Sequence, residues 1–127
     1  MEHKKLPDTE LKVMQVIWHN ETPISTAAIR DKLQEERPWN LSALQTLLGR
    51  LVTRGFLSTE KNGKNRYYEP LVSEEEYLAA DSRRYFQKWK GGSLRDLVAC
   101  LYESEAVTRA ELEDLKAFIE EKTDGRG

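Results

Sequence analysis

The sequence has little of what disulfide frameworks, metal centres or membrane spans require. Its 127 residues include one cysteine and two histidines, so an internal disulfide is impossible and a metal site lacks ligands. No apolar run approaches the roughly 18 residues of a membrane span, and the opening residues MEHKKLPDTE lack the hydrophobic centre of a signal peptide. We therefore expect a cytoplasmic protein without a membrane segment.

Catalytic patterns are missing as well. The chain has no glycine-rich phosphate loop, no zinc-ligand cluster and no activated nucleophile. The adjacent carboxylates Glu74, Glu75 and Glu76 suit the first turn of a helix, where Glu76 completes a capping box. We expect no catalytic residues, no metal and no cofactor, and hence a protein that is not an enzyme.

Charge is distributed unevenly along the chain. Residues 1–70 hold 11 cations and 9 anions, whereas residues 71–127 hold 9 cations and 13 anions. From Arg50 to Arg66, five cations stand against Glu60 alone. Because binding depends on the local field rather than on the net charge of −2, a nucleic-acid partner is compatible with this composition. This charge balance predicts that the protein binds non-specific DNA weakly and that its DNA binding depends strongly on salt.

One helix stands out between Asn40 and Gly55. Its apolar side chains recur at helical spacing from Leu44 to Val52, and the opposite face is small and polar. Asn40 is a suitable N-cap, and Gly55, which tolerates positive φ, ends the helix. A narrow polar helix of this kind fits the major groove of DNA.

A cationic hairpin is predicted next, in residues 57–69. Asn62-Gly63 is a dipeptide typical of a type I′ turn, and Lys61, Lys64 and Arg66 surround it. These cations suit contacts with phosphates that flank the helix. They also protect an edge strand from aggregation, and the two roles are compatible.

Two shorter helices are predicted ahead of the polar helix. Asp8 is a suitable cap for the first and Ser25 for the second. A tight turn at Arg37-Pro38-Trp39 then gives a helix-turn-helix, to which the hairpin adds a wing. Residues 1–70 are therefore expected to form a winged-helix DNA-binding domain, in a fold that is mainly α.

Three further helices are predicted after the hairpin. A capping box at Ser73–Glu76 starts the first, which runs to about Lys90 and stops at Gly91-Gly92. Ser93 caps the second helix and Thr108 caps the third. Each of the three carries an apolar stripe that needs a partner.

These helices form a candidate dimerisation domain, residues 71–127, with a disordered tail at Thr123–Gly127. Their roughly 50 residues bury too little surface to stand alone, so a second copy of the chain is the economical partner. The side chains expected in the interface are Tyr85, Phe86, Trp89, Leu94, Leu97, Val98, Leu101, Leu112, Leu115, Phe118 and Ile119.

Three segments carry a family resemblance. They are LKVMQVIW (residues 11–18), TLLGRLVTRGFLSTEKNGKNRYYEPLVSEEEY (46–77) and KWKGGSLRDLV (88–98). From about residue 6 to residue 122, the chain resembles the penicillinase-repressor (BlaI/MecI-type) family. The resemblance implies a homodimeric repressor on a palindromic operator in double-stranded DNA, whose third helix reads the major groove and whose wing touches the backbone.

The expected DNA contacts combine positions carried over from the family with the local cations. They are Ser42, Ala43, Gln45, Thr46, Gly49, Arg50, Arg54, Lys61, Lys64, Asn65 and Arg66. Gln45 suits a bidentate contact with adenine, and the methyl group of Thr46 suits thymine. Arg50 and Arg54 suit phosphates, although most charges on a helix surface are merely solvated. Gly49 either allows close approach of the DNA or is simply tolerated.

Two alternatives bear on regulation and function. Some relatives are inactivated when a membrane-sensor pathway leads to proteolysis inside the carboxy-terminal module, and by resemblance the matching bond here lies near Cys100-Leu101. A protease is then a further partner. The alternative function is a winged helix that assembles with other proteins and has no operator, which the cation cluster from Arg50 to Arg66 disfavours.

Overall fold

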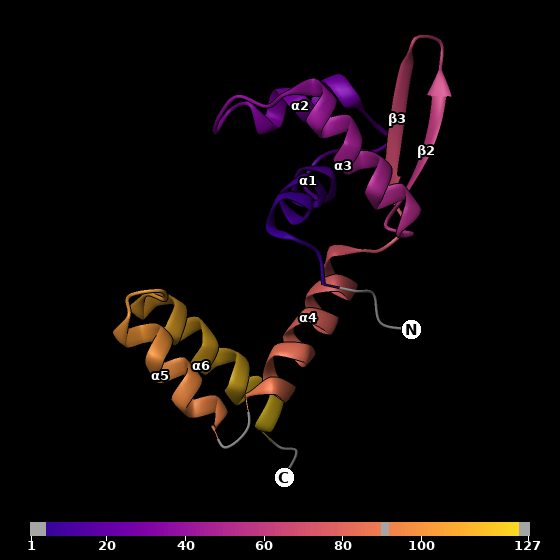
Figure 1. Ribbon diagram of the computed structural model, residues 1–127. Helices are drawn as coiled ribbons and strands as arrows, with labels where there is room; N and C mark the ends of the chain where they lie inside the picture. Colours follow the sequence, from indigo (N-terminus) through magenta and orange to yellow (C-terminus); the bar gives the residue numbers. More distant parts are fainter. Residues whose placement is uncertain (1–4, 90–91, 125–127) are drawn as a thin grey trace. The chain divides into compact units, whose positions relative to one another are not determined.

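The computed structural model describes residues 5–89 and 92–124, which fall into two compact units, Met1–Tyr85 and Phe86–Gly127 (Figure 1). Each unit is described by itself. In chain order the elements are α1 (Asp8–Trp18), β1 (Ile24–Ser25), α2 (Thr26–Leu33), α3 (Leu41–Thr53), β2 (Leu57–Asn62), β3 (Asn65–Pro70), α4 (Glu74–Lys88), α5 (Leu94–Glu103) and α6 (Arg109–Thr123). The expected mainly α fold, with three helices and a hairpin before the last three helices, is confirmed.

The helices of the first unit begin where polar side chains can cap them, with one exception. Ser25 and Asn40 each accept a hydrogen bond from the amide three residues ahead, at 3.1 and 3.0 Å. At α1 the cap position is Pro7, so the predicted Asp8 cap is wrong. Asp8 is instead the first helical residue, where its negative charge favours the helix N-terminus.

The sheet contains a strand that the sequence did not predict. Its order is β1-β3-β2, all antiparallel, and β1 pairs Ile24 with Tyr68. Two residues are too few to show an alternating pattern, which explains the omission. The turn of the hairpin is Gly63-Lys64, because Asn62 pairs with Asn65. Of these two turn residues only Gly63 has a positive φ, of 66°, so the expected type I′ turn, which needs two positive values, is wrong.

The core of the first unit lies where α1, α2, α3 and the sheet meet. Its buried apolar residues are Leu6, Val13, Met14, Ile17, Ile24, Ile29, Leu33, Trp39, Leu44, Leu48, Leu51, Phe56, Leu57, Tyr68, Val72 and Tyr77. The helix α3 turns its apolar stripe into this core and then stops at Gly55, whose φ is 84°. Because the stripe is inside, the polar side of α3 faces out.

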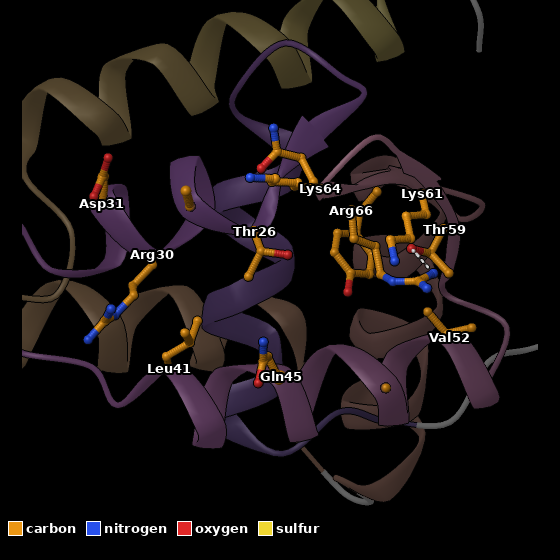
Figure 2. A pocket seen from close by; sticks show the side chains of 14 residues that line it. Thr26, Arg30, Asp31, Leu41, Gln45, Val52, Thr59, Lys61, Lys64 and Arg66 are labelled. Atoms are coloured by element: carbon orange, nitrogen blue, oxygen red, sulfur yellow. Dashed lines mark hydrogen bonds between the residues drawn. The ribbon is translucent and has the colours of Figure 1, made fainter.

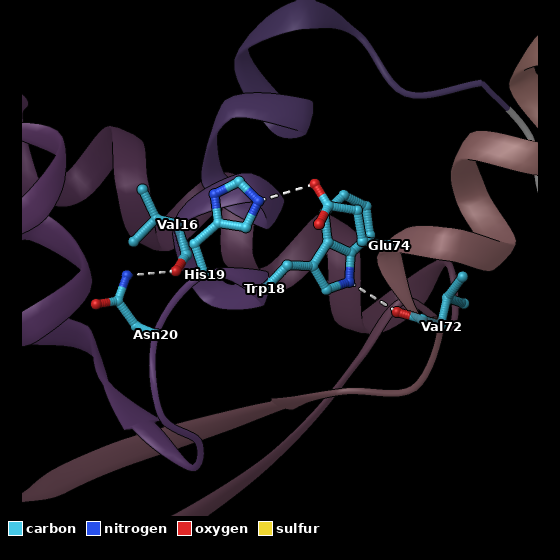
Figure 3. A network of polar contacts seen from close by, with 6 residues as sticks. All are labelled: Val16, Trp18, His19, Asn20, Val72 and Glu74. Carbon is cyan, nitrogen blue, oxygen red and sulfur yellow. Dashed lines mark hydrogen bonds and ion pairs between the residues drawn. The ribbon is translucent and has the colours of Figure 1, made fainter. Parts of the chain in front are cut away.

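The first turn of α4 is fastened to the first unit by three polar contacts of 2.8 Å (Figure 3 shows two of them). The hydroxyl of buried Tyr77 accepts from the main chain just before α1, and the indole of Trp18 donates to the main chain just before α4. His19 pairs with Glu74. The first compact unit runs to Tyr85 and so includes most of α4, whereas the functional division after residue 70 stays a prediction.

The second unit has capped helices, and none of its described residues is buried. Ser93 caps α5 and Thr108 caps α6 in a full capping box. Among its described residues, from Phe86 to Asp124 with the gap at 90–91, every side chain is exposed or half-buried. A folded unit of this kind leaves its apolar stripes only partly covered.

Two boundaries in the second half differ from expectation. α4 ends at Lys88, two residues before the expected Lys90; of the predicted stop Gly91-Gly92, Gly92 is not helical, and Lys90 and Gly91 lie outside the described residues. α6 includes Thr123, whose hydroxyl donates to Ile119, so the predicted disordered tail does not begin there. Residues 125–127 lie outside the described part of the chain.

Candidate nucleic-acid interface

The outer face of α3 presents the side chains predicted from the sequence. Ser42, Ala43, Gln45, Thr46, Gly49 and Arg50 are all exposed. At 3.6 residues per turn they share one side of the helix, because Leu44, Leu48 and Leu51 take the other side into the core. The side chains near the middle of this face are small, and Arg50 adds a cation at one edge.

A hollow of about 720 Å³ lies between α3, α2 and the wing, which we define as β2, β3 and the Gly63-Lys64 turn (Figure 2). Its lining residues are Thr26, Ala27, Arg30 and Asp31 from α2, Leu41, Gln45, Gly49 and Val52 from α3, and Thr59, Lys61, Lys64, Asn65, Arg66 and Tyr68 from the wing. The hollow thus brings the predicted wing cations together with two of the predicted α3 residues.

A second, shallower hollow of about 380 Å³ lies on the other side of α3. It is lined by Thr46, Gly49, Arg50, Thr53 and Arg54. Gly49 belongs to both hollows and therefore lies near the middle of the exposed face. An added Cβ on Gly49 meets nothing within 4 Å, so packing inside the protein does not require glycine here.

The wing carries two cations directly opposite each other. Lys61 pairs with Arg66 in the register of the hairpin, and like charges in that position destabilise a two-stranded ribbon. Arg66 donates to the hydroxyl of Thr59 at 3.4 Å, which orients its guanidinium along the hollow (Figure 2). A bound anion such as a phosphate relieves the repulsion between the two cations.

Arg54 has a partner that the sequence did not reveal. Its guanidinium donates to the carboxylate of Glu10 on α1, and the Glu10 side chain is only 2% exposed. This partner could not be predicted from the sequence, because no helical or strand periodicity relates two residues that are 44 positions apart. The Arg54 side chain is 41% exposed, so this arginine joins α3 to α1 and also borders the second hollow.

Four residues of α2 line the main hollow but were not predicted. They are Thr26, Ala27, Arg30 and Asp31. Arg30 is fixed by a hydrogen bond from its Nε to the carbonyl of Trp39 at 3.0 Å. No pattern in the sequence of α2 indicates that these residues belong to an interface. They line the hollow only because α2 packs beside α3 in the folded domain.

The ion pair between Lys12 and Glu36 belongs to neither hollow. The hydrogen bond and charge of Lys12 lower the pKa of the exposed Glu36 carboxyl, and neither residue lines either hollow.

Within residues 5–89 and 92–124, no three His, Cys, Asp or Glu side chains gather as a metal site would need. None of the helices in those ranges has the length and apolar character to cross a bilayer.

The candidates for the dimer interface lie open in the single chain. Those that are exposed are Tyr85, Phe86, Leu94, Leu101, Phe118 and Ile119, and those that are half-buried are Trp89, Leu97, Val98, Leu112 and Leu115. The Cys100-Leu101 bond lies inside α5, in its last two turns. The carbonyl of Leu101 also accepts from Ala106 at 2.8 Å, which closes the end of that helix.

The model of the penicillinase repressor family matches residues 6–121. The chain belongs to the penicillinase repressor family. It is 31% identical over 121 residues to the penicillinase repressor of Bacillus licheniformis, with 93% of this chain and 94% of that protein covered. It is 28% identical over 118 residues to the methicillin resistance regulatory protein MecI of Mammaliicoccus sciuri, with 93% and 95% covered.

Structural similarity agrees with this membership. The solution structure of the DNA-binding domain of the repressor BlaI is 33% identical and superimposes with a TM-score of 0.53, covering 61% of this chain and 94% of that domain. The penicillinase repressor family is a family of transcriptional repressors rather than a class of enzymes. Both the resemblance and the winged-helix fold expected from the sequence are therefore confirmed.

Proposed function

We propose that this member of the penicillinase repressor family, a DNA-binding transcriptional repressor, acts in the cytoplasm as a homodimer on a palindromic operator. One observation carries the proposal: the small polar face of α3 is exposed beside the cations of the wing. The major groove, about 12 Å wide, admits an α-helix of this kind. The DNA-binding domain of BlaI is a similar structure, which supports the same use of this face.

Within this proposal the contacts fall into two classes. Gln45 and Thr46 read base edges, at about 1–3 kcal/mol of discrimination for each good contact. Ser42 and Ala43 border those bases, and Gly49 lets the backbone of α3 approach them. Phosphates are held by Arg50, Arg54, Lys61, Lys64, Asn65 and Arg66.

Two copies of the chain are needed because each presents one recognition helix. We assign residues 1–70 to DNA binding and residues 71–127 to dimerisation, which the uncovered apolar side chains of α5 and α6 support. Linked recognition helices then enter successive major grooves at a spacing that the dimer sets. Their two half-site affinities act together only while the protomers stay joined.

Cleavage at Cys100-Leu101 by a protease in a membrane-sensor pathway is part of the same proposal. The bond is helical, so α5 must unwind locally before a protease can hold it in extended form. Loss of α6 would then separate the protomers and release the operator. Mass spectrometry of the chain recovered from induced cells tests this, and an intact chain after induction would rule it out.

Selection from random duplex DNA tests the function as a whole. The proposal expects an enriched inverted repeat that the purified protein binds as a dimer. If no sequence is enriched, the operator is excluded, and the winged helix is better explained as a protein–protein assembly module.

A further inference from the structure

The two faces of the wing carry opposite charges. Successive residues of a strand point to opposite faces, and residues that pair across a hairpin share a face. Lys61 and Arg66 are paired and line the hollow beside α3, so they lie on the inner face. Glu60 is paired with Tyr67 and Glu69 with Ser58, so both carboxylates lie on the outer face. The alternation of sign along β2 and β3 is thus a separation of charge in space.

The negative charge of the outer face is not neutralised by the described part of the chain. Glu60 and Glu69 are exposed, and neither has an ion-pair partner among the described residues. Both line another hollow, of about 540 Å³, whose remaining lining residues are Pro23, Ser58, Thr59, Asn62 and Tyr67; it shares only Thr59 with the hollow beside α3. The wing therefore carries positive charge on its inner face and negative charge on its outer face.

Protection of an edge does not account for this arrangement. β2 is an edge strand of the sheet, and charged side chains on an edge hinder pairing with other chains. A positive or a negative side chain would protect the edge equally well, whichever face of the wing it occupied. A separation of cations from anions suits a strongly charged partner that meets the wing from one side.

Taking the proposed DNA-binding function as its basis, we propose that Glu60 and Glu69 are specificity determinants. They keep phosphates away from the outer face, so the wing engages one phosphate backbone through its inner face alone. Insertion into the minor groove, only about 6 Å wide, would bring the outer carboxylates against the second backbone. On the operator, α3 fixes the wing in its favourable orientation. On other DNA the wing meets phosphates from several directions, and the carboxylates penalise those encounters.

The first experiment compares two variants with the same change in net charge. E60Q/E69Q removes the outer carboxylates, whereas E113Q/E120Q removes two exposed carboxylates of α6 that share its polar face. Affinities are measured for a selected operator and for a scrambled duplex of equal length. E60Q/E69Q should raise affinity for the scrambled duplex by roughly threefold or more at low salt and raise operator affinity less. E113Q/E120Q should leave the ratio of the two affinities unchanged.

The outcomes separate this proposal from the function on which it rests. If wild-type protein does not prefer the operator, the proposed function fails and the specificity role falls with it. If wild type prefers the operator but E60Q/E69Q leaves the ratio unchanged, or behaves like the α6 variant, only the specificity role is overturned. A melting temperature close to wild type confirms that both variants are folded.

A second measurement tests the one-sided contact directly. Single phosphates of the operator are replaced by neutral methylphosphonates on each strand in turn, and binding is compared for wild type and K61A/R66A. Phosphates that matter to wild type but not to K61A/R66A should lie on one strand of each half-site. Such phosphates on both sides of the minor groove would overturn the proposal.

Discussion

Gly49 is a residue whose presence the folded protein does not explain. Glycine inside a helix costs about 1 kcal/mol relative to alanine, and an added Cβ here meets no atom within 4 Å. We therefore expect Gly49→Ala to raise the free energy of unfolding by about that amount. Gly49→Leu should abolish operator binding while the protein stays folded, because its side chain occupies the space reserved for DNA. Thermal unfolding and operator titrations check both, and unchanged affinity of Gly49→Leu would refute close approach.

Arg50 and Arg54 are four residues apart on α3 but differ in what they touch. Arg54→Ala should lower the free energy of unfolding by roughly 1–3 kcal/mol, because it leaves the buried Glu10 carboxylate unpaired while water partly screens the lost arginine. Arg50→Ala is the matched control, since Arg50 has no ion pair within the described residues, and it should change stability little. Chemical denaturation measures both. Equal stability of the two variants would show that the Glu10 contact contributes nothing.

At the scale of elements, the paired cations of the wing favour DNA binding but lower the stability of the hairpin. Lys61→Ala removes the repulsion with Arg66, so the hairpin should keep or slightly gain stability, by up to about 1 kcal/mol. The same change should reduce the slope of log affinity against log salt by ~0.9 per bound protomer. Lys116→Ala on α6 removes one exposed cation elsewhere and should not alter the slope. A salt titration of operator binding distinguishes the two, and equal slopes would remove Lys61 from the contact surface.

The elements were predictable where local chemistry decides them. Caps such as Ser25 and Asn40, and the αL residue Gly55, form bonds within one turn, so sequence alone located them. β1 and the bond between Glu10 and Arg54 depend on packing between segments far apart in the chain, and no local pattern encodes them. The same holds for the α2 side of the hollow beside α3. The exposed face of α3 was predictable because helical periodicity separates inside from outside.

At the scale of the whole molecule, the apolar stripes of the second unit test the dimer. Phe118 is 54% exposed and Ile119 is 49% exposed in the single chain, so a charge at either position should not disrupt a core. If α6 joins two protomers, Phe118→Asp buries an unpaired charge in the interface and should yield folded monomers. Operator affinity should then fall by about 10²–10⁴, because the second half-site loses its linkage.

The matched control for Phe118→Asp is Glu113→Gln, on the polar side of α6, which should leave dimers and operator affinity intact. Sedimentation gives the oligomeric state. Thermal unfolding shows whether the first unit is still folded, so loss of binding through unfolding can be told apart from loss through dissociation of the dimer. A Phe118→Asp protein that remains dimeric would move the interface away from α6. A monomeric one that still binds the operator as tightly as wild type would show that each winged helix acts alone, since the affinity of linked sites cannot survive their separation.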